Sequence, residues 1–338
     1  MKKILIATTA LVGTAGMAAA EINFSGSARF GLTYLEDRVD EAGRDAETVL
    51  EQRLRFQVQG VTEADNGLKF EARFRAEAGE DEDNSISGGG FGAAGFAVST
   101  GGFRLDVGNV SDVIDSGDVI NYFGYGVGFT SFLEQNANSV GIPASGFSSG
   151  SQESSTIKLR YTAGDFTVAL SYQNNEDADI GISSVVGGAT VIDNSVEDLE
   201  EYMIGASYSF GDYNVGVAFG NQDGFSDAQD AAGTGGTVVD NDFWAIGFDG
   251  SVGALDFAIL ITDSDLADDV TVGASLDYDI NDATSIRFVV SDGGATGSDT
   301  AVGVGFRHSL GGGVTLAGGI GENNAGLTQA DLGVSFSF

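Results

Sequence analysis

The chain has 338 residues, of which 50 are Asp or Glu and 15 are Lys or Arg, so its formal net charge is −35. This negative charge argues against nucleic acid as a partner, because phosphate binding requires a basic surface. The chain also has 52 glycines, one proline and no cysteine. The low proline count suits strands and argues against disorder, and the lack of cysteine excludes disulfides as a source of stability.

Residues 1–20 have the features of a cleaved secretory signal peptide. Lys2 and Lys3 form a positive start, Ile4–Gly16 is mostly apolar or small, and Ala18–Ala20 provides a cleavage site. The apolar stretch is shorter than the roughly 20 residues that a membrane helix needs, and no later run reaches that length. We therefore predict an exported protein without helical membrane spans, whose mature chain keeps 13 bases and 50 acids and carries a charge of −37.

The mature chain begins with runs that alternate apolar and polar residues. The run 22–34 places residues such as Phe30 on one face and Arg29 on the other. The runs 50–59 and 68–75 repeat the pattern. A period of two over this length predicts strands with one apolar and one polar face.

Thirteen further runs with the same character follow, and no segment has a 3.6-residue apolar stripe that would predict a helix. They lie at roughly 94–100, 103–109, 156–163, 166–173, 200–210, 213–221, 242–252, 255–263, 269–280, 284–292, 299–310, 314–322 and 328–338. Together the runs predict an all-β fold of sixteen strands.

The connections between these runs alternate between short and long. Short ones such as Gly211-Asp212 and Gly253-Ala254 provide the positive φ angles of tight hairpins. The long ones are 36–49, 79–93, 110–155, 174–199 and 222–241. An even number of antiparallel strands with this asymmetry is typical of outer-membrane barrels. We predict that residues 21–338 form a single 16-stranded antiparallel transmembrane β-barrel with short periplasmic turns and long external loops.

Aromatic residues gather at both ends of the predicted strands, on the apolar phase, as expected for the two interfaces of a membrane. Near the short turns lie Tyr161, Phe166, Phe210, Tyr213, Tyr278 and Phe338. Near the long loops lie Tyr34, Tyr172, Tyr202, Phe219 and Trp244. The alternative, aromatic residues scattered as core fillers, does not account for their common phase.

Basic residues fall on the polar phase of the first six predicted strands. They are Arg29, Arg53, Arg55, Lys69, Arg73, Arg75, Arg104, Lys158 and Arg160. Facing lipid at the membrane midplane would cost about 2–4 kcal/mol for each of them, so this phase must point into the barrel. A sixteen-stranded barrel is wide enough for an aqueous channel, in which these charges stay hydrated.

The longest interval, residues 110–155, is expected to be functional, because structureless loops of this length are uncommon. Its acids are Asp112, Asp115, Asp118 and Glu134. We predict that it folds into the lumen as a constriction loop, with its acids opposite the basic side chains Arg53, Arg55, Arg73, Arg75 and Arg104. Opposite charges fixed across a narrow aqueous gap favour polar solutes, and clusters of charge set ion preference.

Two other interpretations of these charges remain open. The loop acids are simply solvated in one of them, and in the other the arginines pair with Glu51, Glu71 or Asp106 on their own wall. The net negative charge predicts a preference for cations, which the basic wall opposes locally.

No resident cofactor is expected. The acids Glu80, Asp81, Glu82 and Asp83 are weak candidates for a structural Ca²⁺ site, because this hard cation takes oxygen ligands. Their spacing is not that of a defined calcium loop, which favours a solvated external loop.

The sequence also argues against an enzyme. Its one histidine, His308, is followed by Ser309 on a predicted strand. Neighbouring strand residues point to opposite faces, so the two side chains cannot form a nucleophile–base pair.

Several segments of the mature chain resemble the trimeric general porins of Gram-negative bacteria, in particular their alphaproteobacterial branch. They are EINFSGSARFGLTY at 21–34, GAAGFAVSTGGFRLDVGN at 92–109, TAGDFTVAL at 162–170, GGGVTLAGGIG at 311–321 and ADLGVSFSF at 330–338. The resemblance implies a sixteen-stranded barrel, a homotrimer and a third long loop folded into the pore. It also implies that Phe338 is a signal for the barrel-assembly machinery, and that outer-membrane lipid and lipopolysaccharide surround the protein.

The predicted function is therefore passive diffusion of ions and small hydrophilic solutes through a water-filled outer-membrane channel. One alternative is a surface-interaction barrel, similar to an adhesin, that uses its acidic external loops. Another is a substrate-specific channel, although a sugar pathway would need an aromatic track along the lumen, and most aromatic residues here fall on the lipid phase.

Overall fold

The computed structural model describes residues 20–40, 43–80, 86–149, 155–178, 182–186, 189–193, 196–226 and 237–338. In these ranges no helix is long and apolar enough to cross a membrane, and the named elements are all strands. They are β1 (Glu21–Leu35), β2 (Thr48–Glu63), β3 (Lys69–Glu80), β4 (Ile86–Phe91), β5 (Gly95–Thr100), β6 (Phe103–Gly108), β7 (Ser155–Ala163), β8 (Phe166–Ala178), β9 (Ile182–Val186), β10 (Ala189–Asp193), β11 (Val196–Phe210), β12 (Tyr213–Ser226), β13 (Thr237–Val252), β14 (Leu255–Ser264), β15 (Asp269–Asn281), β16 (Thr284–Gly294), β17 (Ala301–Gly311), β18 (Val314–Glu322) and β19 (Thr328–Ser337).

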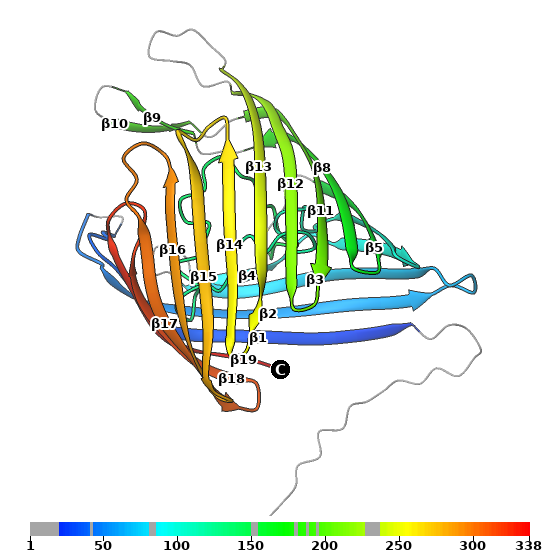
Figure 1. Cartoon of the computed structure of the whole chain (residues 1–338), viewed down its shortest axis with the longest axis horizontal. Coiled ribbons are helices and arrows are strands. Elements are labelled where there is room, and N and C mark those ends of the chain that lie inside the picture. The colour runs from blue at the N-terminus through cyan, green and yellow to red at the C-terminus, as the bar shows by residue number, and fades with distance from the viewer. Residues whose placement is uncertain are drawn as a thin grey trace, which may run out of the picture.

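The strands form a closed antiparallel barrel (Figure 1). β1 pairs with β2 on one side and with β19 on the other, and β8 pairs directly with β11. β4 and β5 both pair with β3, so they are two parts of one wall strand, and the barrel has sixteen strands. β9 and β10 form a separate hairpin. The prediction of a sixteen-stranded barrel is confirmed.

Closure satisfies the backbone groups that an open sheet would leave unpaired in lipid. The last residue takes part: Gly26 N–H donates to the Phe338 carbonyl at 2.8 Å, and Phe338 N–H donates back to the Gly26 carbonyl at 3.0 Å. The barrel is therefore sealed between the first and last strands of the chain.

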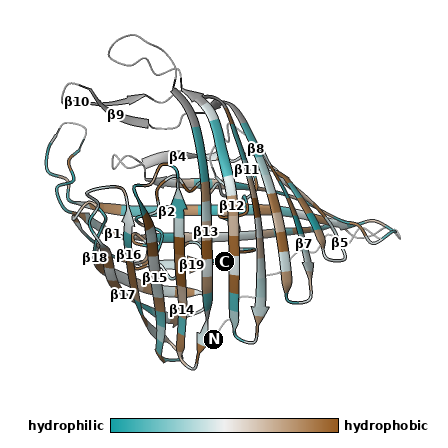
Figure 2. Cartoon of the chain, turned by 45° about the horizontal axis from the view of Figure 1, so that its top comes forward, coloured by the Kyte–Doolittle hydropathy of each residue, from teal (hydrophilic) through white to brown (hydrophobic). Residues whose placement is uncertain are grey.

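The outer surface is apolar, as the alternation predicts. Phe30 and Leu332 are both more than half exposed, whereas Arg29 and Asp331, their neighbours on β1 and β19, lie on the opposite face. Figure 2 shows this alternation of hydrophobic and hydrophilic residues along the strands. Predicted girdle residues meet other rings, as in the contact between Phe103 and Tyr161 at 4.3 Å.

Strands extend further than predicted at the long-loop end. β8 continues to Ala178 and β13 begins at Thr237, so parts of the predicted loops are strand. One wall strand is interrupted between β4 and β5, where the Asn109 side chain donates to the Ala93 carbonyl at 2.9 Å and Asn109 N–H donates to the Ala94 carbonyl at 3.0 Å. At this point the strand pairing is interrupted, and hydrogen bonds to Asn109, at the start of the long segment after β6, replace it.

Candidate functional site

The described part of the long segment after β6, residues 109–149, lies inside the barrel and is here called the inner loop (Figure 1). Its backbone contacts hydroxyl groups on inward-facing strand positions. Val113 N–H donates to Ser171 Oγ of β8 at 3.3 Å, and Tyr125 N–H donates to Ser275 Oγ of β15 at 2.9 Å. The loop therefore docks along the inward faces of β8 and β11–β19, which we call the covered wall.

Asp331 on β19 holds the far tip of the loop. Its carboxylate accepts hydrogen bonds from Phe129 N–H at 3.1 Å, from Thr130 N–H at 2.9 Å and from the Thr130 hydroxyl at 2.7 Å. Sequence reasoning missed this residue, although an acid on the inward phase of an otherwise uncharged strand is a visible signal.

A hydrophobic core lies between the loop and the covered wall. Ile114 and Ile120 of the loop are fully buried against wall residues that include Met203 and Leu260. Burying a side chain of this size contributes roughly 1.5–3 kcal/mol. Because the core forms between loop and wall, the inner loop is a packed structural part of the barrel.

Glycines of the covered wall make this close packing possible. A Cβ atom at Gly216 would lie 1.9 Å from the carbonyl oxygen of Val119, and one at Gly273 would lie 1.8 Å from that of Gln135. Both contacts are with backbone, which cannot swing aside as a side chain can. Glycine inside these strands therefore reflects the approach of the loop.

The return limb of the loop is held by buried polar groups. Asn138 N–H donates to Ser291 Oγ at 3.0 Å, its amide donates to the Gly293 carbonyl at 3.2 Å, and its own carbonyl accepts from the Thr271 hydroxyl at 2.9 Å. Asn138 and Thr271 are each about 1% exposed. The return limb of the loop is thus fixed to β15 and β16.

The inward faces of β1–β3 and β5–β7 carry the predicted basic residues and are here called the basic wall. Several pair with acids of the same wall, as one of the open interpretations held. Arg29 meets Glu51 at 2.6 Å, and Arg55 meets Glu77. Arg104 pairs with both Glu71 and Asp106, at 3.0 Å each.

Asp118 links the loop acids to the basic wall. Its carboxylate accepts from Lys158 Nζ at 2.8 Å and also pairs with Arg160. Burial alone would raise the pKa of Asp118, but the two cations outweigh burial and hold it below its usual range. Asp118 is therefore ionised at neutral pH.

Phe147 forms a second bridge to the basic wall, which sequence reasoning missed. Its ring lies 4.2 Å from the Arg73 guanidinium carbon and 4.4 Å from that of Arg75. Arg75 Nη1 also donates to the Phe147 carbonyl at 3.0 Å. The signal in the sequence was a lone aromatic residue within a Gly- and Ser-rich stretch.

The expectation that the four loop acids all face the basic wall is wrong for Asp112. This side chain is fully buried and accepts hydrogen bonds from Asp115 N–H, at 2.7 Å, and from Ser145 N–H. Burial, followed by the nearby charge of Glu201, raises the pKa of Asp112 to about 8. The physical reason is local: aspartate readily bonds to backbone N–H groups a few residues along the chain.

In the described part of the chain, Asp115 and Glu134 are neither paired with the basic wall, as Asp118 is, nor fully buried, as Asp112 is. Within the described ranges Asp115 forms no ion pair, whereas Asp118 on the same loop does. Glu134 is partly buried, and burial raises its pKa to about 7. It lines a cavity of about 550 Å³ together with Arg53 and Arg307.

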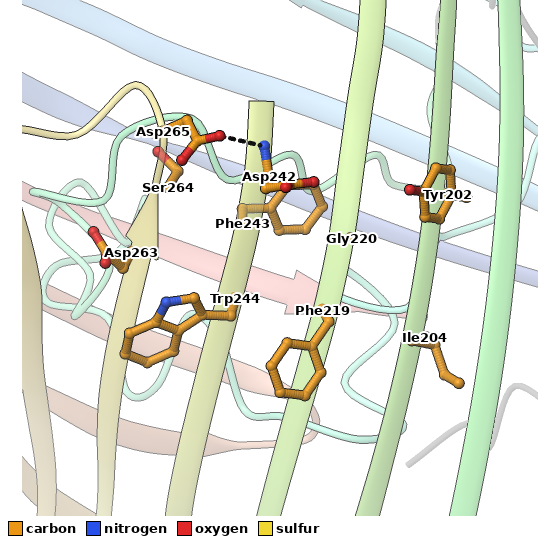
Figure 3. A pocket seen from close by; sticks show the side chains of 10 residues that line it. All are labelled: Tyr202, Ile204, Phe219, Gly220, Asp242, Phe243, Trp244, Asp263, Ser264 and Asp265. Atoms are coloured by element: carbon orange, nitrogen blue, oxygen red, sulfur yellow. Dashed lines mark hydrogen bonds between the residues drawn. The ribbon is translucent and has the colours of Figure 1, made fainter. Parts of the chain in front are cut away.

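A different pocket, of about 380 Å³, lies on the outer surface (Figure 3). Ile204, Phe219 and Trp244 line it and are register partners on neighbouring strands, so they share the outward face. Tyr202 and Phe219 are each more than half exposed. This pocket belongs to the predicted aromatic girdle and lies outside the lumen.

Two predicted features fall at or beyond the limits of the described structure. The signal-peptide prediction covers residues 1–20, of which residues 1–19 are not described. The calcium candidates Asp81, Glu82 and Asp83 are not described either, nor is the side chain of Glu80. Across the described residues, no group of three or more acidic or histidine side chains is arranged to hold a metal ion.

The chain was compared with known proteins. It is 28% identical over 319 residues to a porin of Fuscovulum blasticum, and 26% identical over 330 residues to a porin of Rhodobacter capsulatus. Each comparison covers 94% of this chain and 100% of the relative.

Solved structures of engineered variants of the Rh. blastica porin match with a TM-score of 0.70 at 25% identity, again over 94% of this chain and 100% of theirs. A sequence model of the Gram-negative porin family matches residues 7–326. With the closed barrel and the loop inside it, these matches show that the chain belongs to the Gram-negative porin family and forms an outer-membrane channel for passive diffusion.

Proposed function

We propose that the conducting pathway runs between the basic wall and the inner loop. The observation that carries this proposal is the docking of the loop on one side of the lumen only. Its core, its hydrogen bonds and its close backbone contacts lie mainly against β8 and β11–β19. The cations of β1–β3 and β5–β7 form the opposite side of the lumen. These two sides, the covered wall and the basic wall, are called the banks of the lumen.

The constriction lies where the two banks meet. Asp118 reaches Lys158 and Arg160 at one contact, and Phe147 reaches Arg73 and Arg75 at another. Fixed charges of opposite sign at such a point favour polar solutes over apolar ones. Ions and small hydrophilic solutes are the proposed cargo, and the proposal includes no catalytic activity.

Ion selectivity is proposed to be weak. Many wall cations are offset by neighbouring acids, since Arg29, Arg55 and Arg104 each have a carboxylate partner. The formal charge of −37 of the mature chain then favours cations in the approach to the pore.

The remaining proposals follow from the N-terminal segment and from family resemblance. The protein is exported with cleavage after residue 20, is inserted by the barrel-assembly machinery through Phe338, and assembles as a homotrimer among lipid and lipopolysaccharide. Structural Ca²⁺ at residues 80–83 is proposed separately, from the carboxylates of that segment. The Phe338 ring is exposed on the outer surface of the folded barrel, which supports contact with lipid.

Conductance of the purified protein in a planar lipid bilayer tests the pathway. We expect discrete conductance steps in KCl that appear in groups of three, and a small reversal potential in a salt gradient with the sign of cation preference. A folded barrel that gives no steps would contradict the channel proposal and favour the surface-interaction alternative.

A further inference from the structure

The cavity beneath the tip of the inner loop has an unusual set of lining residues. Its volume is about 550 Å³, and it is bounded by β1, β2 and β17–β19 and roofed by loop residues 129–134. Arg29, Arg53 and Arg307 supply cations, and Ser131, Thr315 and Ser335 supply hydroxyl groups. One carboxylate, Glu134, also lines it.

The strand register places two of these cations directly opposite each other. Arg29 on β1 is the register partner of Arg53 on β2, on the same inward face. Like charges in this position destabilise a sheet. Glu51 compensates Arg29 at 2.6 Å, but in the described part of the chain Arg53 has no ion pair and no side-chain hydrogen bond.

A second like-charge pair in the basic wall shows what full compensation looks like. Arg104 and Arg160 are also register partners. Arg104 has two carboxylate partners, and Arg160 has Asp118. Arg73 and Arg75 of the same wall also lack a carboxylate partner in the described ranges, but both lie against the Phe147 ring, and Arg75 donates to the Phe147 carbonyl. Arg53 differs from them because its guanidinium faces the cavity without such a contact.

Arg307 is the second unused guanidinium. Its neighbour Arg287 pairs with Asp277 at 2.7 Å and donates to the Gly126 carbonyl of the loop at 3.1 Å. Over the described ranges Arg307 makes no such contact, although it is partly buried and faces the same cavity as Arg53. Arg53 and Arg307 are thus two half-buried cations with unused donors that line one cavity.

We infer that this cavity is a binding site for small oxyanions of the phosphate type. A guanidinium presents a planar fork of donors that matches two oxygens of an oxyanion, which chloride cannot reproduce. The hydroxyl groups of Ser131, Thr315 and Ser335 are suited to the remaining oxygens. The inference rests on the proposed function, because it places the site on the conducting pathway, where it would hold phosphate-bearing solutes during passage.

Inorganic phosphate is the probe for the test. In a planar bilayer, the KCl conductance of the full mature protein is measured as phosphate is added at about pH 8, well above the second pKa of a phosphate group. We expect a saturable fall in conductance. Arg53→Gln and Arg307→Gln should each raise the half-saturating phosphate concentration about tenfold, since each removes a charge-assisted contact.

Two further variants separate geometry from charge. Arg53→Lys keeps the charge but removes the fork, and should raise the half-saturating concentration severalfold. Lys69→Gln removes one charge from the basic wall outside the cavity. The half-saturating phosphate concentration should then stay within about twofold of the wild-type value.

The outcomes distinguish this inference from the proposed function. A conducting channel whose current phosphate does not reduce saturably would overturn the oxyanion site and leave the channel intact. Equal shifts for Lys69→Gln and Arg53→Gln would also overturn it, because the effect would then be general electrostatics. A folded protein with no conductance would contradict both.

Discussion

The two banks of the lumen are built from the same antiparallel ladder but from different inward residues. The basic wall carries long cationic side chains such as Arg73 and Arg75, while the covered wall carries small ones such as Gly216 and Ser275. Small residues let another backbone lie directly against the strand, whereas long charged ones keep water next to it. Side-chain size at alternate positions therefore decides where the loop docks and where the channel remains open.

The two banks also differ in how they hold the loop. On the covered wall most contacts are close-packed and apolar, as between Ile120 and Leu260, and the charged side chains Asp331 and Arg287 add hydrogen bonds to the loop. On the basic wall they are few and electrostatic, and Asp118 and Phe147 supply most of them. Changes on the first bank should therefore move the loop, and changes on the second should alter selectivity.

The largest effect is expected from filling the space that the covered wall leaves for the loop. In Gly216→Val the new side chain would collide with the Val119 backbone, whose oxygen lies 1.9 Å from the Cβ position. The loop should shift toward the basic wall, so single-channel conductance should fall and stability should drop by roughly 1–3 kcal/mol. Conductance and thermal unfolding of the refolded barrel measure the two effects.

Gly60→Val on β2 is the matched control, since a Cβ atom at Gly60 meets nothing within 4 Å. It should leave conductance unchanged. Equal behaviour of the two variants would show that the wall glycines do not set the position of the loop.

The second effect concerns the electrostatic contact between the banks. Asp118→Asn keeps the shape of the side chain but leaves Lys158 and Arg160 without a carboxylate. The reversal potential in a salt gradient should shift toward anions, and stability should fall by roughly 1–3 kcal/mol. Asp115→Asn is the control, and it should shift the potential less. A larger shift for Asp115→Asn would place the constriction elsewhere.

The comparison also shows what alternation alone can predict. Period-two patterning predicts the strands, their inward and outward faces and hence the basic wall, because a strand has only two faces. It does not predict which loop acid meets a cation, because Asp118 and Lys158 are 40 residues apart and their approach depends on the path of the loop. Alternation also does not predict that Asp112 points away from the basic wall, where its carboxylate accepts a hydrogen bond from Asp115 N–H in a local turn.

The residues missed by sequence reasoning share one property. Asp331 and Phe147 each join the loop to a wall strand over a long sequence separation. Gly216 and Gly273 were visible as glycines inside strands, but their role emerges only when the carbonyl groups of the loop lie against them.

A smaller effect is expected at the aromatic contact. Phe147→Leu removes the ring between Arg73 and Arg75 but keeps the backbone carbonyl that Arg75 contacts. Removing each cation–π interaction should cost about 0.5–1 kcal/mol, which thermal unfolding of the barrel measures. Phe132→Leu serves as the control, because Phe132 packs on the apolar core of the loop. A Phe147→Leu variant as stable as wild type would show that the arginines do not hold the ring.

The smallest effect should be a pH dependence of selectivity. Burial raises the pKa of Glu134 to about 7, so lowering the pH from about 8 to about 6 neutralises a carboxylate beside Arg53 and Arg307. Cation preference should therefore weaken as the pH falls. The reversal potential should change by a few millivolts at most, because about one charge among many is neutralised.

Glu134→Gln separates this carboxylate from the other groups of the lumen that titrate near neutral pH, Asp112 among them. Between about pH 6 and about pH 8, the variant should keep the ion selectivity that the wild-type channel has at the low end of this range. The part of the pH dependence that Glu134 causes should therefore be absent. The free energy of unfolding provides an independent measurement. The folded state binds the Glu134 proton more tightly than the unfolded chain does, because burial raises the pKa of Glu134. The contribution of Glu134 to the free energy of unfolding therefore declines as the pH rises from the ordinary glutamate pKa of about 4.3 to about 7. If the selectivity of Glu134→Gln depends on pH as that of wild type does, a group other than Glu134 controls the charge of the cavity.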